Sequence, residues 1–277
     1  MYVDVDGARL WYDIDGAGRD RPTLVLVHGG PGCYDHQYLK PDFARMALDA
    51  QVVYLDLRGH GKSDWGDAAD WTLEACADDL HAFCEALEFA RPIVYGHSMG
   101  APIVLLYGAR HPGHAAGLIA HGAFARLDIP RLVEGFRRVA GDEVAAIAER
   151  SYSGEDVPEH EWDRVYAAFG PHVPTDEEAK GWPSNVELNE HGMEVIRQLD
   201  IVDELAAVDV PTLVVVGELD PVTPIAAADE VVAALPEGIG RLRVLDDAGH
   251  FSWKDEPESF FQLLSEFVQT VGRARVA

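Results

Sequence analysis

Over the first 123 residues, short apolar runs bounded by glycine, proline or polar residues alternate with longer stretches whose apolar residues recur at helical spacing. Such short runs predict buried strands, and the longer stretches predict helices. The predicted strands lie near residues 23–28, 51–56, 92–96 and 117–121, and the predicted helices near 36–48, 72–88 and 99–111. This alternation is typical of a mostly parallel sheet with helices on both faces, and residues 1–7 are expected to open it as the first strand of a hairpin.

The strand pattern stops after Phe124 and does not return until about Asp200. Amphipathic stretches separated by glycine and proline take its place. They predict helices over residues 130–140, 142–151 and 158–169. A helical insertion between two core strands is typical of a lid.

The rest of the chain completes the core. Strands are predicted in the runs Pro211–Gly217 and Leu242–Leu245, and an amphipathic helix over residues 257–272 closes the chain. A chain of 277 residues with 48% hydrophobic content suits one large α/β domain with an inserted part. We therefore expect a core made of residues 1–123 and 201–277, and a lid made of residues 124–200.

The strand near residues 92–96 ends in Gly96-His97-Ser98-Met99-Gly100, and an apolar helix-like stretch follows directly. A serine at the apex of a sharp strand-to-helix turn presents its hydroxyl for nucleophilic attack. Glycines two residues before and after it remove Cβ atoms that would clash where strand and helix pass close together. Ser98 is therefore predicted to be a nucleophile, with a simple Gly/Ser turn as the alternative.

A nucleophilic serine needs a histidine base and a group that orients this base. Asp220 follows one predicted strand and His250 follows the next, so both are expected at the carboxyl edge of the sheet. Either alone could be an ordinary turn aspartate or a surface histidine, because the chain has 12 histidines. The order Ser98, Asp220, His250 is the order of α/β-hydrolases, and it predicts a catalytic triad.

The strand near residues 23–28 ends in the glycine-rich loop His28–Gly32. The amide of Gly30 is expected to stabilise an oxyanion together with the amide of Met99, the residue after the nucleophile. An ordinary Gly/Pro turn is the alternative. His28 is expected to be a structural histidine bound to the loop.

These motifs identify a resemblance. Over nearly its whole length the chain resembles an α/β-hydrolase, and His28–Gly32 resembles the corresponding loop of the proline iminopeptidase family, which removes N-terminal proline or other residues. The run Asp56–Ser63 is similar to a loop shared by that family and many other α/β-hydrolases. The family's elbow usually reads Gly-Gly-Ser-aromatic-Gly, whereas His97 and Met99 here are closer to esterases, lactonases and cofactor-free haloperoxidases. In one branch a glutamate that holds the substrate's ammonium follows the catalytic aspartate, and Pro221 stands at that place.

Charge and composition narrow the classes of partner. With 48 acidic and 22 basic residues, the formal net charge is −26, and this makes nucleic acid an unsuitable partner. The chain has no run that suggests a membrane span, a signal peptide, a metal site or a nucleotide-binding loop. Three cysteines, an odd number, do not suggest a disulfide framework. We expect a cytoplasmic enzyme without cofactor or metal, acting on a small molecule or short peptide.

Candidates for substrate contact lie mainly in the expected lid. They are the aromatic residues Trp162, Tyr166 and Trp182, with Glu187 and His121. By the resemblance, Glu187 stands where the peptidase family carries a lid glutamate for the α-amino group. As alternatives, aromatic residues of this kind more often pack a lid onto the core, Glu187 could be solvated, and His121 could be satisfied locally.

The sequence thus predicts a serine hydrolase that cleaves a small amide or ester through an acyl-enzyme, similar to proline iminopeptidases. A carboxylesterase, lactonase or haloperoxidase-type perhydrolase is the alternative. A ligand-binding receptor on a hydrolase fold is a third possibility, and the presence of all three triad residues argues against it.

Overall fold

A twisted sheet of eight strands forms the centre of the molecule in the computed structural model, which describes residues 1–18 and 21–273. The strands are β1 (Tyr2–Val5), β2 (Ala8–Asp15), β3 (Thr23–Val27), β4 (Gln51–Leu55), β5 (Ile93–His97), β6 (Gly117–His121), β7 (Thr212–Gly217) and β8 (Gly240–Leu245). Their order in the sheet is β1-β2-β4-β3-β5-β6-β7-β8. β2 is antiparallel to both of its neighbours, β1 and β4, and all other neighbouring pairs are parallel, which confirms the predicted mostly parallel sheet.

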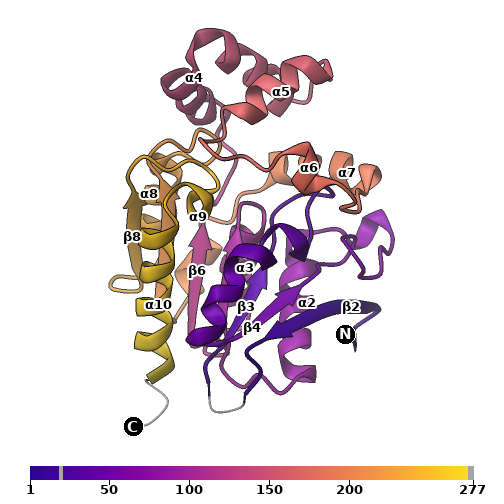
Figure 1. Cartoon of the computed structure of the whole chain (residues 1–277), viewed down its shortest axis with the longest axis vertical. Helices are drawn as coiled ribbons and strands as arrows, with labels where there is room; N and C mark the ends of the chain where they lie inside the picture. The colour runs from indigo at the N-terminus through magenta and orange to yellow at the C-terminus, as the bar shows by residue number, and fades with distance from the viewer. Residues whose placement is uncertain (19–20, 274–277) are drawn as a thin grey trace.

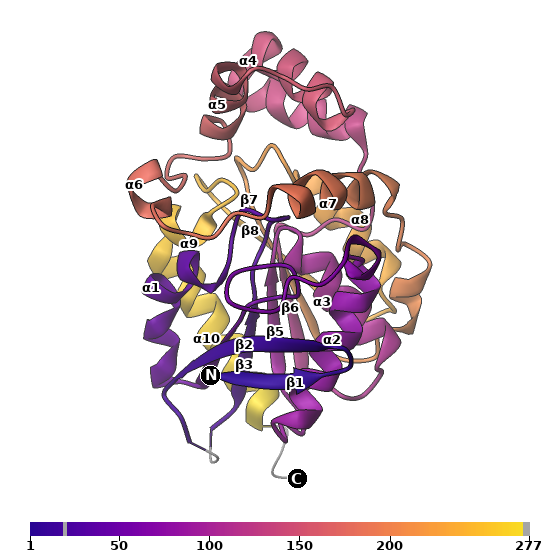
Figure 2. The ribbon, with the colours of Figure 1, turned by 90° about the vertical axis from the view of Figure 1, so that its right-hand side faces the viewer.

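Helices cover both faces of this sheet (Figure 2). The α-helices are α1 (Lys40–Phe43), α2 (Leu73–Ala86), α3 (Gly100–Arg110), α4 (Ile129–Tyr152), α5 (Glu159–Ala167), α6 (Asp176–Ala179), α7 (Val186–Gln198), α8 (Ile225–Ala234), α9 (Ser252–Asp255) and α10 (Pro257–Arg273). Helices α1, α9 and α10 lie on one face, and α2, α3 and α8 lie on the other (Figure 2). Helices α4 to α7 lie beyond the carboxyl edge of the strands (Figure 1). No helix in the described ranges is long and apolar enough to cross a lipid bilayer.

The prediction of one continuous helix over residues 36–48 is wrong. The segment forms a 3₁₀ turn at His36–Tyr38, the short α1, and a second 3₁₀ turn at Ala44–Leu48. Pro41 has no N–H to continue a helix from the first turn, so it is accommodated only at the start of α1. In α4 the backbone leaves the helical region at Gly141 (φ 84°), so the two stretches predicted there form one kinked element.

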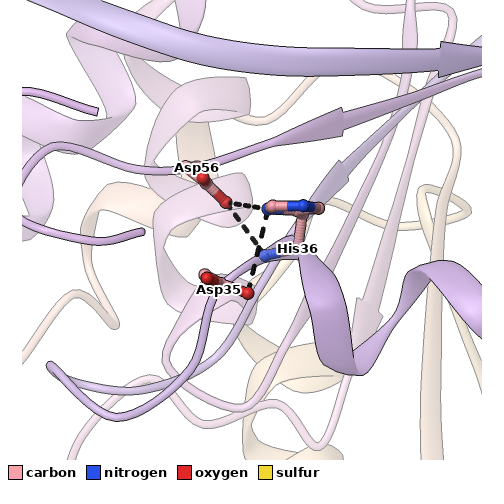
Figure 3. A group of neighbouring side chains, drawn as sticks. All are labelled: Asp35, His36 and Asp56. Atoms are coloured by element: carbon pink, nitrogen blue, oxygen red, sulfur yellow. Dashed lines mark hydrogen bonds and ion pairs between the residues drawn. The ribbon is translucent and has the colours of Figure 1, made fainter. Parts of the chain in front are cut away.

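The loop after β4 is tied down by Asp56 (Figure 3). One carboxylate oxygen accepts hydrogen bonds from the backbone N–H of His36 (2.9 Å) and its Nδ1 (2.7 Å), and the other accepts from the backbone N–H of Lys62 (3.0 Å). Asp35, the third member of this buried group, accepts from the backbone N–H of Gln37 at 2.7 Å. A cation among these three side chains would have to displace those bonds, so the group is best explained as a structural tie.

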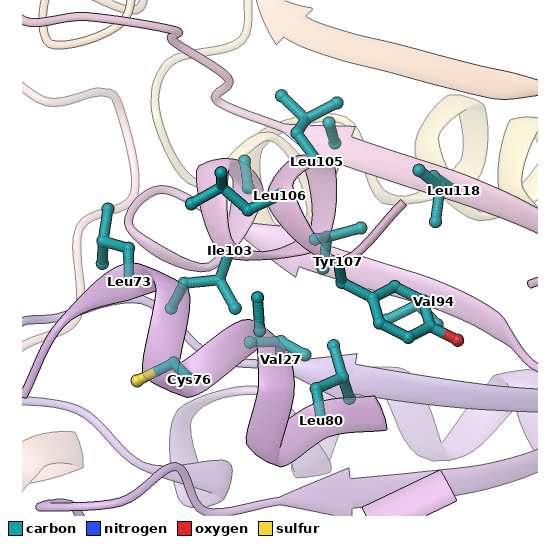
Figure 4. Packing of buried hydrophobic residues seen from close by; sticks show 14 of the residues in the cluster. Val27, Leu73, Cys76, Leu80, Val94, Ile103, Leu105, Leu106, Tyr107 and Leu118 are labelled. Carbon is teal, nitrogen blue, oxygen red and sulfur yellow. The ribbon is translucent and has the colours of Figure 1, made fainter. Parts of the chain in front are cut away.

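The core consists of two apolar layers, one on each face of the sheet. On the face covered by α2 and α3, Val27 and Val94 of the strands pack against Leu80 and Ile103 of the helices (Figure 4). These side chains are fully excluded from solvent. At about 25 cal/mol per Å² of buried apolar surface, such layers hold the strand ends in fixed relative positions. The loops after β3, β5, β7 and β8 therefore start from a rigid edge.

Candidate active site

Ser98 lies at a strained turn between β5 and α3. Its backbone has φ 53°, a left-handed conformation that non-glycine residues rarely adopt, and its N–H donates to the carbonyl of His121 at 2.9 Å. A Cβ on Gly100 would lie 2.6 Å from the carbonyl oxygen of Val27, and one on Gly96 would overlap the backbone of Gly100. The two glycines therefore permit the close approach of strand and helix on which the elbow depends.

Asp220 and His250 are in direct contact beyond β7 and β8. The Asp220 Oδ2 atom lies 2.7 Å from His250 Nδ1, and both side chains are almost completely buried. The same carboxylate accepts from the backbone N–H of Val222 (2.9 Å) and of Thr223 (3.0 Å), and from the Thr223 hydroxyl (2.7 Å). Burial alone would raise the pKa of Asp220, but His250 and the hydrogen bonds outweigh it and lower this pKa. The carboxylate is thus held ionised against the imidazole.

The loop after β3 lies beside the elbow. Within the described residues, the amide N–H groups of Gly30 and Met99 have no hydrogen-bond partner, and both residues line the cavity described next. His28 is fully buried, donates from Nδ1 to the carbonyl of Gly29 (2.6 Å), and accepts the N–H of Leu57 at Nε2 (3.1 Å). His28 has a structural position, because one ring nitrogen is bonded within its own loop and the other to the loop after β4.

A cavity of about 400 Å³ opens over these groups, with Ser98, His250 and Gly30 in its wall. The rest of the wall is mainly aromatic and aliphatic. It includes Tyr34, Phe124, Tyr152, Trp162, Tyr166, Phe169, Met193 and Ile196. A volume of this size suits a small organic molecule or a short peptide.

Comparison with known proteins gives the family. Residues 22–257 match the family described as alpha/beta hydrolase fold. The chain belongs to this family. The hydrolase is 26% identical to a proline iminopeptidase from Thermoplasma volcanium over 97% of its own length and 96% of the relative. It is 27% identical to a non-heme haloperoxidase from Rhodococcus erythropolis, covering 88% of this chain and 90% of the other.

Among solved structures, the hydrolase resembles the enol-lactonase from Burkholderia xenovorans LB400. The TM-score is 0.72 at 24% identity, with 97% of this chain and 100% of the other covered. At this identity the likeness shows a shared fold. The relatives therefore support a hydrolase and differ in the reactions that their names describe.

Two of the five predicted substrate-contact residues lie in the cavity wall. Trp162 and Tyr166 line it, both from α5. Trp182 is not among the lining residues and packs edge-on against Tyr34, with ring centroids 5.8 Å apart. For Trp182 the structure matches the packing alternative.

His121 and Glu187 do not reach the cavity of the hydrolase. His121 is fully buried, its Nδ1 lies 2.8 Å from the Tyr95 hydroxyl, and its Nε2 lies 3.2 Å from Ser252 Oγ. Glu187 lies in the first turn of α7 with its side chain exposed to solvent. The expectation that these two residues contact substrate is not supported, because local hydrogen bonds hold one and the helix turns the other outward.

No local sequence pattern identified the residues by which the helical insertion (residues 124–200, between β6 and β7) contacts the site. Asn189 donates from its side chain to the carbonyl of Pro31 (2.8 Å), and the N–H of Asn185 donates to the carbonyl of Gly32 (2.8 Å). These bonds join α7 to the loop that carries Gly30. The start of α7 had a readable signal, since Asn185 caps the helix by accepting the N–H of Leu188 at 3.1 Å. Its target did not.

Proposed function

We propose that this hydrolase cleaves a small carboxylic ester or amide through an acyl-enzyme on Ser98. The observation that carries the proposal is the buried 2.7 Å contact between Asp220 and His250, where His250 shares the cavity wall with Ser98, a serine at a strained elbow. Acyl transfer requires a base that a carboxylate orients and a serine whose hydroxyl is presented to the substrate, here by the strained turn of its backbone.

In the proposed mechanism, the hydroxyl oxygen of Ser98 attacks the carbonyl carbon of the substrate while His250 accepts the hydroxyl proton at Nε2. Asp220 keeps the proton on Nδ1 and stabilises the imidazolium that forms. The amides of Gly30 and Met99 donate to the developing oxyanion. His250 then gives its proton to the leaving alcohol or amine, and a water molecule releases the acid by the same steps in reverse.

The cavity favours an uncharged acyl group. Four charged residues line it, and three of these are engaged in protein contacts: Arg126 and Arg131 with Glu230, and Asp128 with the N–H of Arg131. A substrate ion would have to compete with those partners in a mostly apolar site, where an unpaired charge is costly. We therefore place neutral esters and amides first, in agreement with the esterase-like residues His97 and Met99 around the nucleophile.

An aminopeptidase of the proline iminopeptidase kind is the second candidate. The sequence relative of that name supports it, and so does Asp163, a cavity-wall carboxylate without a side-chain hydrogen bond or ion pair among the described residues. A substrate ammonium could pair with it. Its exposed position weakens such a contact by screening.

The test is a panel of p-nitrophenyl esters, lactones, and Pro-, Ala- and Leu-p-nitroanilides, with labelling of Ser98 by a fluorophosphonate. Wild type is compared with Ser98→Ala. Turnover of esters or anilides together with labelling that Ser98→Ala abolishes is the expected result. Labelling without turnover of any member would favour the receptor hypothesis, and absence of both would overturn the proposal.

A further inference from the structure

His97 stands directly before the nucleophile, yet the proposed mechanism gives it no part. Its side chain is 1% exposed, and its ring lies between the rings of His250 (4.7 Å between centroids) and His121 (4.9 Å). Both ring nitrogens have hydrogen-bond partners. One partner is the hydroxyl of Tyr38, which also contacts the loop that carries Gly30, and the other is the backbone carbonyl of His250.

The direction of the hydrogen bonds follows from their donors. The N–H of Gly29 donates to the hydroxyl oxygen of Tyr38 at 2.7 Å, so the hydroxyl proton of Tyr38 is free to point elsewhere. The other contact of this hydroxyl is His97 Nδ1, at 3.0 Å, which therefore accepts. The proton of the neutral ring is then on Nε2, which donates to the backbone carbonyl of His250 at 2.8 Å.

The ring stays neutral in this arrangement. Burial, followed by the neighbouring His250 and His121, lowers the pKa of His97 well below its ordinary value. A second proton would have to go to Nδ1, where Tyr38 donates. His97 is thus a fixed donor toward His250.

We propose, on the basis of the proposed function, that His97 is a positioning residue that holds the backbone of His250 so that its imidazole faces Ser98, with Tyr38 setting its tautomer. The peptide groups of His250 have a second support, since its N–H donates to the carbonyl of Phe169 at 2.6 Å. Asp220 holds the ring at Nδ1. Without the bond from His97, the ring can pivot about the contact with Asp220, and its Nε2 moves relative to the serine.

A neighbouring pair shows that this contact is specific. His121, opposite His97 in the register of β5 and β6, also has a tyrosine at Nδ1, but its Nε2 points to Ser252. The Ser252 hydroxyl in turn donates to the carbonyl of Gly249 at 2.8 Å. Of these two histidines, His97 bonds the carbonyl of His250 directly, whereas His121 reaches the preceding carbonyl, that of Gly249, only through the Ser252 hydroxyl.

The test uses two amides that mimic different ring nitrogens. In His97→Gln the side-chain NH₂ can reach the position of Nε2 and still donate to His250. In His97→Asn the shorter amide takes the position of Nδ1 and leaves the carbonyl of His250 without a donor. With p-nitrophenyl butyrate we expect His97→Asn to lower kcat about 30-fold with KM within about threefold, because displacement of a reacting group by about 1 Å costs up to about 100-fold. We expect His97→Gln to stay within about threefold of wild type.

A second pair of variants covers the case in which neither His97 variant folds. Tyr38→Phe removes the donor to His97. Tyr107→Phe is the control, because Tyr107 is a buried tyrosine on α3, away from the site, whose hydroxyl makes an equivalent contact with His114 Nδ1 (2.5 Å). We expect a loss of about tenfold in kcat for Tyr38→Phe alone, on the same geometric grounds. Equal effects of the two would contradict the proposal.

A readout that does not need turnover separates this proposal from the proposed function. The Nδ1 proton of His250, bonded to Asp220, is expected as a strongly downfield proton resonance in wild type and His97→Gln, and shifted or broadened in His97→Asn. If the resonance behaves in this way but the wild-type protein hydrolyses no substrate of the panel, the positioning role of His97 stands and the proposed function is overturned. Equal loss of kcat in Asn and Gln variants, or an unchanged resonance in His97→Asn, would overturn the positioning role.

Discussion

The backbone N–H of His250 donates a hydrogen bond of 2.6 Å to the carbonyl of Phe169. Phe169 belongs to the helical insertion, its ring lines the cavity, and this ring meets the imidazole of His250 edge-on with centroids 5.5 Å apart. Glycine at 170 and at 249 lets the two backbones touch, because a Cβ on either would contact the other's Cα. The segment that closes the cavity thus also supports the proposed base, so movement of the insertion would affect chemistry as well as binding.

Asp255 is expected to matter for this contact. Its carboxylate accepts the N–H of Gly249 (2.8 Å) and the N–H of His172 (3.0 Å), so it joins the loop of the proposed base to the insertion. Asp255→Ala removes hydrogen bonds to a charged group, each worth about 1.5–3 kcal/mol. We expect a lower melting temperature and a fall in kcat of about tenfold, since the imidazole loses alignment. Asp246→Ala, exposed on the same loop, is the control, and equal behaviour of the two variants would contradict the role.

Ser98→Ala is expected to remove turnover and leave the fold intact. The side chain carries the attacking atom, and loss of a triad nucleophile costs about 10⁶-fold in kcat. Steady-state rates on the best substrate and circular dichroism check the two parts. Activity above about one hundredth of wild type would show that another group attacks, because that exceeds what the remaining site supplies.

Asp220→Asn is expected to lower kcat by about 10⁴-fold, because the amide favours the wrong tautomer of His250. Thr223→Val is the matched comparison. It removes only the hydroxyl that donates to Asp220 at 2.7 Å, and the carboxylate keeps its other partners. Its loss should be about tenfold or less, as for one hydrogen bond of about 1–1.5 kcal/mol. Near-normal rates for Asp220→Asn would exclude it as the orienting group.

A free amino group on the substrate is expected to give little advantage. Proline p-nitroanilide with a free nitrogen and with an acetylated nitrogen should differ less than about tenfold in kcat/KM, or about 1.4 kcal/mol. Glu187→Gln should leave this ratio unchanged, because Glu187 is exposed and outside the cavity wall. A preference above about a hundredfold that disappears in Asp163→Asn would support the aminopeptidase instead.

Acid is expected to destabilise the protein already below neutral pH. Burial lowers the pKa of His60 and of His121 to about 3, whereas the histidines of an unfolded chain titrate near about 6.5. As the pH falls below about 6.5, the unfolded chain binds protons that the folded chain cannot, so the free energy of unfolding decreases until the pH reaches about 3. Each such histidine contributes about 1.4 kcal/mol per pH unit in this window.

Urea unfolding between pH 8 and pH 5 measures this dependence. His28 and His97, whose pKa values burial also lowers, should add to the slope. His121→Gln should reduce the slope of the free energy of unfolding against pH by the contribution of one histidine, about 1.4 kcal/mol per pH unit, whatever its effect on stability at pH 8. A free energy of unfolding that stays constant from pH 7 to pH 5 would contradict the prediction.

The sequence was sufficient for features that depend on neighbouring residues in the chain. Apolar runs located the core strands, and the glycines around Ser98 marked the elbow, because the strained turn is formed by these residues themselves. The proximity of Asp220 and His250 followed from parallel strands, whose carboxyl ends share one edge. The sheet brings the two residues to the same edge, whereas the bonds of His250 to His97 and Phe169 come from other parts of the fold.

The sequence was insufficient where a side chain's direction depends on distant packing. Glu187 stood in a plausible segment, but the direction it faces is set by how α7 docks on the loop of Gly32. The bond from the N–H of His250 to the carbonyl of Phe169 joins residues far apart in the chain, with no local pattern at either end. His121 ends a strand beside the site, and its direction was decided by Tyr95 and Ser252.

The helical insertion leaves and re-enters the core at adjacent points. Arg126 pairs with Asp200 in an isolated antiparallel bridge, the N–H of Ile201 donates to the carbonyl of Ala125 at 2.9 Å, and the flanking strands β6 and β7 are neighbours. The insertion is therefore closed at its base like the stem of a hairpin. A different helical segment could be inserted at this stem without changing the order of the strands. The same core could therefore carry insertions with different substrate-binding residues.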